Sequence, residues 1–423
     1  MKIETIKKVN PFICLFVILF LLGPGQSRQV FGKETAKKPS LEVLNKETVE
    51  VPAPQQLLPD QVEKIEAFIQ RQMTTGKIPG LAVVIVMGDR TVYEKGFGFA
   101  DLDKKIPVTP TTLFELGSTS KAFTGLGLLR MEKEGLLKMS DPVEKYLPWL
   151  KLKYKGKEVP VTIGQFLHQT SGVPFETIAE IPEASGADAL EKTVRNLVGE
   201  ELLHEPGSKF FYATINYDVL ALIIQQISGL PFEEYMKKNI LLPLGLTDTY
   251  LYREEAGAKG MATGYKLSFN KPRPYDAPMY RGNTPAGYFI TNVRDLARWL
   301  KIQMGTIAYN GFDKELVEKS HISDPDLPDS IYAAGWMVLK NRQLITHGGA
   351  NPNYSSFIGF GGEKIGVAVQ ANINSNFVTG IGYGILSILR DIDPKPTSAA
   401  NDLNMRFDAL SSKIVYVLIL FVL

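Results

Sequence analysis

Cysteine and histidine are both scarce in this chain of 423 residues. Cys14 is the only cysteine, so the chain has no internal disulfide framework and no site of several thiolates around a metal ion. The four histidines, His168, His204, His321 and His347, show neither an H-E-x-x-H motif nor another paired spacing. We therefore expect neither a metal nor a cofactor. A G-x-S-x-G motif is also missing, which leaves a Ser-His-Asp hydrolase without support.

An excess of charge of one sign is missing as well. Lys and Arg number 47 and Asp and Glu 45, which gives a formal net charge of +2. This balance creates no overall field that would attract nucleic acid, so we expect no nucleic-acid partner. Hydrophobic residues make up 44% of the chain. At about 150 residues per domain, the length suffices for two to three domains and a large core.

The N-terminus has the pattern of a secretory signal peptide over residues 1–27. Three lysines precede the apolar run PFICLFVILFLL, and the small residues of GPGQS follow it, with cleavage expected after Ser27. An uncleaved anchor is the alternative, although a run of about 12 residues is short for a bilayer. Residues 28–58 are charged, contain proline and lack sustained periodicity, which predicts a linker.

The C-terminus is apolar throughout after Lys413. A spanning helix needs about 20 apolar residues, roughly twice the length of this run. We interpret residues 413–423 as the start of a membrane anchor that follows a linker over residues 396–412. The alternative is an apolar tail buried on the domain. Together, the two ends predict an exported protein anchored at the outer face of the cytoplasmic membrane.

Residues 59–395 are predicted to form one domain with strand-rich ends and a helical middle. A helix from Pro59 and a hairpin of LAVVIVM and TVYEKGFGFAD come first. YAAGWMVLK, QLITHGGA, SSFIGFGG and IGVAVQANI predict later strands, followed by a helix over residues 380–390. Strands from both ends most economically join one antiparallel sheet flanked by helices, while residues 118–305, including NVRDLARWLKIQM, form an inserted helical lobe. This is a two-lobed α/β fold, and a site is expected in the cleft between the lobes.

The first candidate for chemistry is a serine three residues before a lysine in ELGSTSKAFTG. Residues three apart share a helix face, so Ser118 and Lys121 can approach hydrogen-bonding distance and act as nucleophile and base. A lysine with its usual pKa of about 10.4 is a poor base at neutral pH, so this role also requires burial or a nearby cation. The alternative is an ordinary helix that begins with a capping serine. The pattern recurs at Ser268 and Lys271, which we assign to a loop.

Two later segments make the catalytic interpretation more specific. Tyr212 precedes an apolar helix in FFYATINYDVL and could relay a proton to a leaving group. His347 ends a strand in ITHGGAN, where two glycines allow the backbone to approach a substrate closely. Alone, the tyrosine is more typical of a core aromatic and the histidine of a satisfied surface residue. Their order and spacing after Ser118 supply the specificity.

Together these motifs resemble those of the serine β-lactamase and penicillin-binding superfamily, in its class C branch. S-T-S-K, a Y-x-N-like element at Tyr212, and H-G-G in place of K-T-G occur in the order of that family. LHQTSGVP, EPGSKFFYATINYDVL, LLPLGLTDT and AAGW match the same branch. The resemblance covers residues 60–392 and implies a β-lactamase-like fold with its active site between the two lobes.

Within this branch, the sequence is most similar to the membrane-anchored peptidases that mature colibactin and zwittermicin-type prodrugs. YKGKEVPVTIGQFLHQTSGVPF, ATGYKLSFNKP, HGGANPNYSSF and ANINSN carry this likeness. It implies a serine peptidase that removes an N-acyl-D-asparagine cap from a nonribosomal peptide–polyketide precursor outside the cytoplasm. Members of the subgroup carry transmembrane helices after the peptidase domain, which agrees with the apolar C-terminus here.

The resemblance also implies roles for individual residues. By position, Ser118 matches the nucleophile, Lys121 its base and Tyr212 the proton relay, while the backbone N–H groups of Ser118 and Ala350 match the oxyanion hole. The substrate-binding positions are Glu115, Thr214, Asp276, His347 and Asn351. The histidine takes the place of the lysine in K-T-G, so we expect it to form a polar wall of the site and not to act as a triad base.

Two of these positions depart from the family pattern. Thr214 stands where the subgroup has serine and where β-lactamases and D,D-peptidases have the asparagine of Y-x-N. A hydroxyl is shorter than an amide and forms different hydrogen bonds, so we expect peptide hydrolysis to exceed β-lactam hydrolysis. Asn216 lies four residues after Tyr212 and is not the missing asparagine. Asp276 replaces a histidine, which leaves either a remodelled pocket or a different substrate.

Other functions stay open at this point. A D,D-carboxypeptidase or β-lactamase-like enzyme would turn over penicillin or nitrocefin, and an esterase of the same branch would cleave p-nitrophenyl esters without cleaving amides. A non-catalytic wall-binding protein would keep the fold and lose the chemistry. The intact Ser118, Lys121 and Tyr212 argue against that last alternative.

Overall fold

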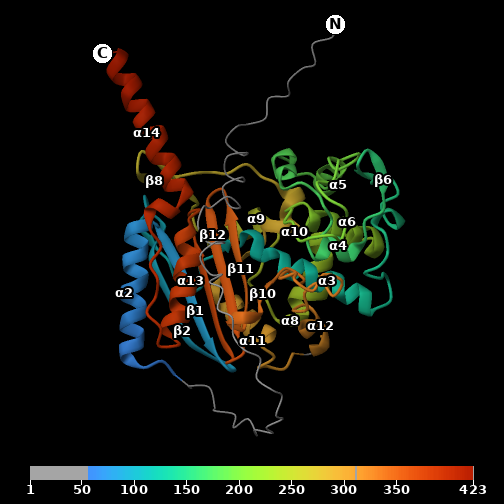
Figure 1. The fold of residues 1–423 in the computed structure, drawn as a ribbon. Coiled ribbons are helices and arrows are strands. Elements are labelled where there is room, and N and C mark those ends of the chain that lie inside the picture. The colour runs from blue at the N-terminus through green and yellow to red at the C-terminus, as the bar shows by residue number, and fades with distance from the viewer. Residues whose placement is uncertain (1–55, 310–311, 423) are drawn as a thin grey trace, which may run out of the picture.

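The computed structural model describes residues 56–309 and 312–422, which form a sheet-based lobe and a helical lobe side by side (Figure 1). The central sheet has seven strands in the order β10-β11-β12-β13-β1-β2-β3. In it, β1 (Gly80–Met87) pairs antiparallel with β2 (Arg90–Asp101) on one side and with β13 (Ile365–Ala371) on the other. Strands from both ends of the domain therefore join one antiparallel sheet, as predicted.

One edge of this sheet reaches the helical lobe. The remaining strands are β3 (Ile106–Pro107), β10 (Met337–Leu339), β11 (Leu344–Asn351) and β12 (Tyr354–Gly361). Strand β11 pairs with β12 along its whole length but with β10 only over residues 344–346. In the described chain, residues 347–351 thus have no strand partner on the β10 side. The short 3₁₀ turn η1 (Gly117–Ser120) packs against β11 instead.

Helices cover both faces of the sheet (Figure 1). On one face, α2 (Pro59–Gly76) and α13 (Asn376–Ile388) pack together over a buried apolar core. On the other face, α11 (Val293–Gln303) packs against β1 and β13, with Leu300 next to Gly366. The prediction that placed NVRDLARWLKIQM in the inserted lobe is therefore wrong, because the apolar stripe of α11 is needed to cover the sheet.

The helical lobe is built around two long helices, α3 (Lys121–Lys133) and α6 (Asn216–Ser228), which pack on each other. Its shorter elements are α4 (Ile163–Leu167), α5 (Ala189–Arg195), α7 (Phe232–Met236), α8 (Leu242–Leu244), α9 (Arg253–Gly257), α10 (Thr284–Gly287), α12 (Lys314–Lys319), β5 (Leu152–Tyr154) and β6 (Lys157–Val159). The two-stranded pair β4 (Phe114–Glu115) and β9 (Ile290–Thr291) lies next to the central sheet. The predicted two-lobed α/β architecture is thus present.

A second hairpin corrects the interpretation of the repeated S-x-x-K pattern. This hairpin consists of β7 (Tyr265–Ser268) and β8 (Lys271–Pro274), so the second serine–lysine pair ends one strand and begins the next, and does not lie in a loop. Phe269 and Asn270 form the two-residue turn with φ angles of +49° and +64°, as in a type I′ turn. No helix holds this second pair together.

The chain ends in one long helix, α14 (Leu403–Val422), which projects away from the domain (Figure 1). The prediction of a linker over residues 396–412 is therefore wrong from Leu403 onward, because the helix continues unbroken into the apolar segment. Across the described residues, no helix is both long enough and apolar enough to cross a membrane. The predicted signal peptide, and residues 28–55 of the predicted N-terminal linker, lie outside the described chain.

Candidate active site

The loop that carries Ser118 is fixed against the free edge of β11. Gly117 begins this turn with a φ of +57°, and a Cβ added to it would lie 2.3 Å from the backbone nitrogen of Ala350. Glycine alone meets both demands without strain or overlap. The two backbone N–H groups predicted to form the oxyanion hole, those of Ser118 and Ala350, thus come from segments in direct contact. Ser118 does not cap α3, since Ser120 holds that position.

We expect Gly117→Ala to lower the rate of Ser118 acylation by about 10-fold or more, because the added methyl group must displace the β11 edge and strain the turn. Gly135→Ala is the matched control: Gly135 also has a positive φ, of 75°, but no neighbouring heavy atom lies within 4 Å of its added Cβ. Single-turnover kinetics measures the acylation rate of both variants, and thermal unfolding measures their stability. Both variants carry the strain of a positive φ, and only Gly117→Ala adds a clash. Equal acylation rates in the two variants would contradict this account of Gly117.

Lys121 begins α3, and its side chain is fully buried. Its Nζ lies 3.1 Å from Ser118 Oγ and donates to the carbonyl of Ala286 at 2.7 Å. The Tyr212 ring centroid is 5.2 Å from the same nitrogen. Burial lowers the pKa of this amine to about 7, although Asp218 acts in the opposite direction. The burial that the S-x-x-K motif requires is therefore present, and much of the amine is neutral near pH 7.

Asp218 is a second ionisable group in this interior, and the sequence analysis missed it. It lies on α6 and is fully buried. Burial raises its pKa well above the usual range, while Lys121 lowers it. When the Asn283 amide is oriented with its nitrogen toward this carboxyl group, that nitrogen donates to Asp218 Oδ2 at 2.9 Å. The sequence did offer a signal for Asp218, since it is a charged residue inside the apolar run NYDVLALIIQQI. The residues on both sides of it are buried.

Tyr212 precedes α6, and its buried hydroxyl makes no hydrogen bond within the described part of the chain. Burial raises the pKa of Tyr212 above the usual tyrosine range, and the nearby hydroxyls of Ser118 and Tyr332 partly offset this. The phenol is therefore protonated at neutral pH. An unpaired donor beside the serine is suited to donate a proton to a group that a substrate brings into the site.

His347 is buried on β11 and is neutral. Its Nδ1 lies 2.6 Å from the carbonyl of Gly348, and its Nε2 lies 3.1 Å from the hydroxyl of Tyr332. These partners assign the proton to Nδ1, so that Nε2 accepts from the tyrosine. Burial and the charge of Lys121 lower the His347 pKa to about 4. The histidine therefore supplies no positive charge at the position of the K-T-G lysine, and among the described residues no aspartate or glutamate hydrogen-bonds to it.

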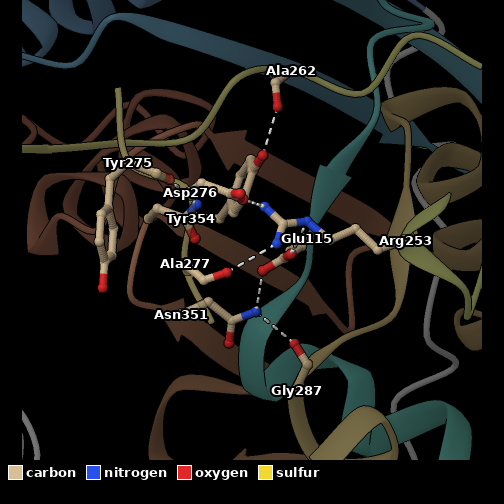
Figure 2. Close-up of polar contacts among 10 residues, drawn as sticks. Glu115, Arg253, Ala262, Tyr275, Asp276, Ala277, Gly287, Asn351 and Tyr354 are labelled. Atoms are coloured by element: carbon tan, nitrogen blue, oxygen red, sulfur yellow. Dashed lines mark hydrogen bonds and ion pairs between the residues drawn. The ribbon is translucent and has the colours of Figure 1, made fainter. Parts of the chain in front are cut away.

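A chain of polar contacts links five other residues beside this site, as Figure 2 shows. Asn351 Nδ2 donates to Glu115 Oε2 at 2.7 Å and to the carbonyl of Gly287 at 2.9 Å. Arg253 Nε lies 3.8 Å from Glu115 Oε1, and its Nη2 lies 3.0 Å from Asp276 Oδ1. Burial raises the pKa of Glu115 to about 7, whereas Asn351 and Arg253 lower it and Asp276 raises it further.

Arg253 holds the Asp276 side chain through an ion pair. The sequence analysis did not identify Arg253. The Asp276 side chain is 93% exposed and paired with the guanidinium, which also donates to the carbonyl of Ala277 at 3.0 Å. Both Glu115 and Arg253 line a shallow pocket with three tyrosines: Tyr252, Tyr280 and Tyr288. Arg253 stands in LYREEAG, an ordinary charged helix start, so nothing in the sequence indicated this contact.

Thr214 and Asn216 differ in the way their side chains are used. Asn216 is fully buried and donates to Gln169 Oε1 at 2.6 Å, while its own Oδ1 accepts from Ser171 at 3.0 Å. It is therefore occupied in holding the interior, in agreement with the view that it is not the missing Y-x-N asparagine. Thr214, in contrast, is buried, and its hydroxyl makes no hydrogen bond to another described residue.

The site thus combines a serine hydroxyl, a buried amine, a protonated phenol and an unpaired strand edge. In the part of the chain that the structure describes, no group of three or more histidine, cysteine, aspartate or glutamate side chains is arranged to hold a metal ion. These organic groups suffice for nucleophilic attack by the serine with proton transfer to and from the neighbouring amine and phenol.

Comparison with known proteins gives consistent results. A family model described as beta-lactamase matches residues 65–386. The protein Flp of Staphylococcus aureus (strain COL) is 35% identical over 328 residues, which are 75% of this chain and 64% of Flp, so less than two thirds of Flp is matched. The octameric penicillin-binding protein homologue from Pyrococcus abyssi superposes with a TM-score of 0.70 and 32% identity, covering 79% of this chain and 78% of that one.

A more distant structure shares the fold alone. EstCE1, a hydrolase with promiscuous acyltransferase activity, has a TM-score of 0.65 at 21% identity and covers 78% of this chain and 97% of its own.

Proposed function

Since this chain belongs to the β-lactamase and penicillin-binding superfamily of serine hydrolases, we propose that it is a peptidase that opens an amide through an acyl-enzyme at Ser118. The observation that carries the proposal is the fully buried Lys121, whose Nζ lies 3.1 Å from Ser118 Oγ. A buried amine with a pKa of about 7 is a competent base at neutral pH.

The reaction follows from the positions of these groups. Neutral Lys121 takes the proton of Ser118 as Oγ attacks the amide carbon, and the resulting oxyanion accepts from the N–H groups of Ser118 and Ala350. Such donors are each worth about 3–4 kcal/mol in the transition state. The C–N bond then breaks as the leaving amine takes a proton through Tyr212. Water then attacks the ester carbon; the bond to Ser118 Oγ breaks, Oγ takes a proton that the water supplies, and the acid is released.

For the substrate, we propose an N-acyl-D-asparaginyl amide at the end of a small-molecule precursor. Asn351 Nδ2 is occupied by Glu115 and Gly287, which leaves its Oδ1 free to accept from a carboxamide. The free hydroxyl of Thr214 is a second polar group for the same side chain. Asp276 does not belong to this pocket as an independent acceptor, because it is paired with Arg253.

We expect N-myristoyl-D-asparagine anilide to be cleaved at least about 10-fold faster than its L counterpart, since the wrong enantiomer leaves the polar groups of the pocket unpaired. Mass detection of the released N-acyl-D-asparagine measures this. N-myristoyl-D-alanine anilide is the control for the carboxamide and should react more slowly. Equal cleavage of the D and L compounds would reject the D-asparaginyl assignment while leaving serine hydrolysis intact.

A D,D-carboxypeptidase or β-lactamase activity is the second candidate, and the neutral His347 argues against it. A protonated side chain at this position would pair with the carboxylate of such a substrate, whereas His347 has a pKa of about 4 and is neutral at pH 7. Slow or undetectable nitrocefin turnover is the expected result. An esterase function is supported only by a shared fold and ranks below amide hydrolysis.

We also propose that the protein is exported and held at the outer face of the cytoplasmic membrane. The support is the apolar, exposed second half of α14, together with the signal-like N-terminus of the sequence.

A further inference from the structure

The second half of α14 is apolar and exposed on every side. Its exposed fractions are 52% for Ile414, 37% for Val415, 58% for Tyr416, 49% for Val417, 58% for Leu418 and 48% for Ile419. Six consecutive residues of an α-helix point in all directions, because a turn takes 3.6 residues. A protein groove covers one stripe of a helix, whereas lipid surrounds it. This helix end therefore fits a bilayer better than a groove.

The first half of α14, in contrast, is fixed to the catalytic domain. Asp402 is fully buried and accepts from Ser375 Oγ at 2.9 Å. Asn404 Nδ2 donates to the carbonyl of Asn374 at 3.0 Å, and Asn374 Nδ2 donates to the carbonyl of Asn351 at 2.7 Å. The direction of the exposed helix is thereby set relative to the active site, so any surface beside the helix has a defined orientation toward whatever the helix enters.

The tip of the β7–β8 hairpin lies beside this helix. Asn270 N donates to Asp408 Oδ2 at 2.6 Å, and the Phe269 ring meets the Tyr416 ring edge-on at 5.8 Å. Phe269 is nonetheless 45% exposed, and its φ of +49° is an unfavourable conformation for a bulky side chain. An exposed aromatic residue at a strained turn, next to an apolar helix, is unexplained by the packing of the domain itself.

Cations lie on the β7–β8 hairpin, on α14 and at the end of α2. Lys266, Lys271, Arg273, Arg406 and Lys413 are exposed, Lys77 is half-buried, and none of the six forms an ion pair with a described residue. Lys77 Nζ donates to the carbonyl of Asn270 at 3.0 Å, and Lys266 Nζ lies 3.8 Å from the Tyr275 ring centroid. The hairpin contains no acidic residue, and the two at the start of α14, Asp402 and Asp408, are buried and hydrogen-bonded. Near the base of the hairpin, Asp101 and Asp103 lie close to Tyr265, and Asp101 is 13% exposed and pairs with Lys104. The exposed Asp276, two residues after β8, pairs with Arg253.

We propose that the β7–β8 hairpin and the exposed half of α14 form one lipid-contacting surface, with Phe269 and Tyr416 at the level of the headgroups and the surrounding cations on anionic lipid. Aromatic residues favour this depth of a bilayer, and each nearby lysine or arginine strengthens binding to an anionic surface by about five-fold. The proposal rests on the membrane attachment proposed above and is independent of the hydrolase mechanism.

Vesicle flotation of the full chain tests the charges. Lys266→Gln/Lys271→Gln/Arg273→Gln removes three cations from the hairpin, and Lys151→Gln/Lys155→Gln/Lys157→Gln removes three at the β5–β6 hairpin of the other lobe as a matched control. On vesicles with phosphatidylglycerol, the first variant should bind at least about 10-fold more weakly than the control. On phosphatidylcholine alone, the two should bind equally. If the two variants bind equally to both kinds of vesicle, the hairpin is not part of the lipid-contacting surface. If no variant floats with the vesicles, the proposed membrane attachment itself is wrong.

Depth quenching tests the aromatic tip. In the vesicle-bound chain, brominated lipid should quench the added fluorescence of a Phe269→Trp variant. It should not quench that of Val198→Trp, a control on the helical lobe where Val198 is 50% exposed. Absence of quenching at position 269 would overturn the proposal. Cross-linking of that position to a second copy of the chain would do the same, because the surface would then serve self-association.

Discussion

Ser118→Ala is expected to reduce amide hydrolysis by about 10⁴-fold or more while the fold stays intact, because removal of a serine nucleophile eliminates the covalent route. Alanine fits the η1 turn, since Ser118 does not cap α3 and its hydroxyl lies beside Lys121. The measurements are turnover of the D-asparaginyl anilide and intact mass after rapid quenching. Wild-type protein should gain the mass of the acyl group, and the variant should not.

Ser268→Ala is the matched control for this experiment. It removes the serine of the second S-x-x-K pair, which ends β7 in a hairpin without a helix to hold a lysine against it. Activity and adduct formation should be unchanged. Cleavage of the anilide by Ser118→Ala at the wild-type rate would refute the mechanism. Absence of an adduct and of turnover in the wild type would favour the non-catalytic wall-binding alternative.

The lobes and the order of the catalytic motifs could be predicted because they depend on local patterns. The apolar run LAVVIVM, the turn GDR and the following TVYEKGFGFAD identified the β1–β2 hairpin. The contact between Ser118 and Lys121 follows from their three-residue spacing. The wrong predictions concern features that depend on tertiary packing or on unusual backbone angles. Helix α11 was assigned to the wrong lobe because an amphipathic stripe does not say which surface it covers. The turn at Phe269 was missed because its positive φ angles do not involve glycine.

The electrostatics of the site could not be predicted at all. Whether Lys121 has its usual pKa or one near 7 depends on burial beneath residues distant in sequence, such as Ala286 on α10. The same holds for the pairing of Asp276 with Arg253, which removes an aspartate from the expected pocket. Spacing within a motif therefore indicates which groups meet, and tertiary packing determines their protonation states.

Lys121 supplies the second large effect. Lys121→Arg and Lys121→Met should each lower the acylation rate by about 10²–10⁴-fold, because a guanidinium remains protonated and a thioether accepts no proton. In the wild type, kcat/KM should rise with pH through about 7, where the buried amine loses its proton. Stopped-flow acylation from pH 5 to 11 measures the rate and this acid limb, which neither variant should show.

Stability gives a check on the same pKa that does not depend on activity. The Lys121 pKa is lowered from 10.5 to about 7 on folding. Between these values the unfolded chain binds more protons, so the free energy of unfolding should rise with pH across this window, and the penalty of the buried charge is fully present below about pH 7. The effect is isolated by comparing Asp218→Asn with Asp218→Asn/Lys121→Met. The shared substitution removes Asp218, the other buried group that titrates beside the amine.

The position of the acid limb also decides between two bases. Tyr212 has a pKa raised above its usual range by burial, so a reaction that needed its phenolate would gain rate only above about pH 10. A limb near pH 7 that is lost in Lys121→Met identifies the amine as the group that takes the Ser118 proton. A limb above pH 10, or full activity of Lys121→Arg, would transfer that role to Tyr212 and leave Lys121 as a fixed charge beside the nucleophile.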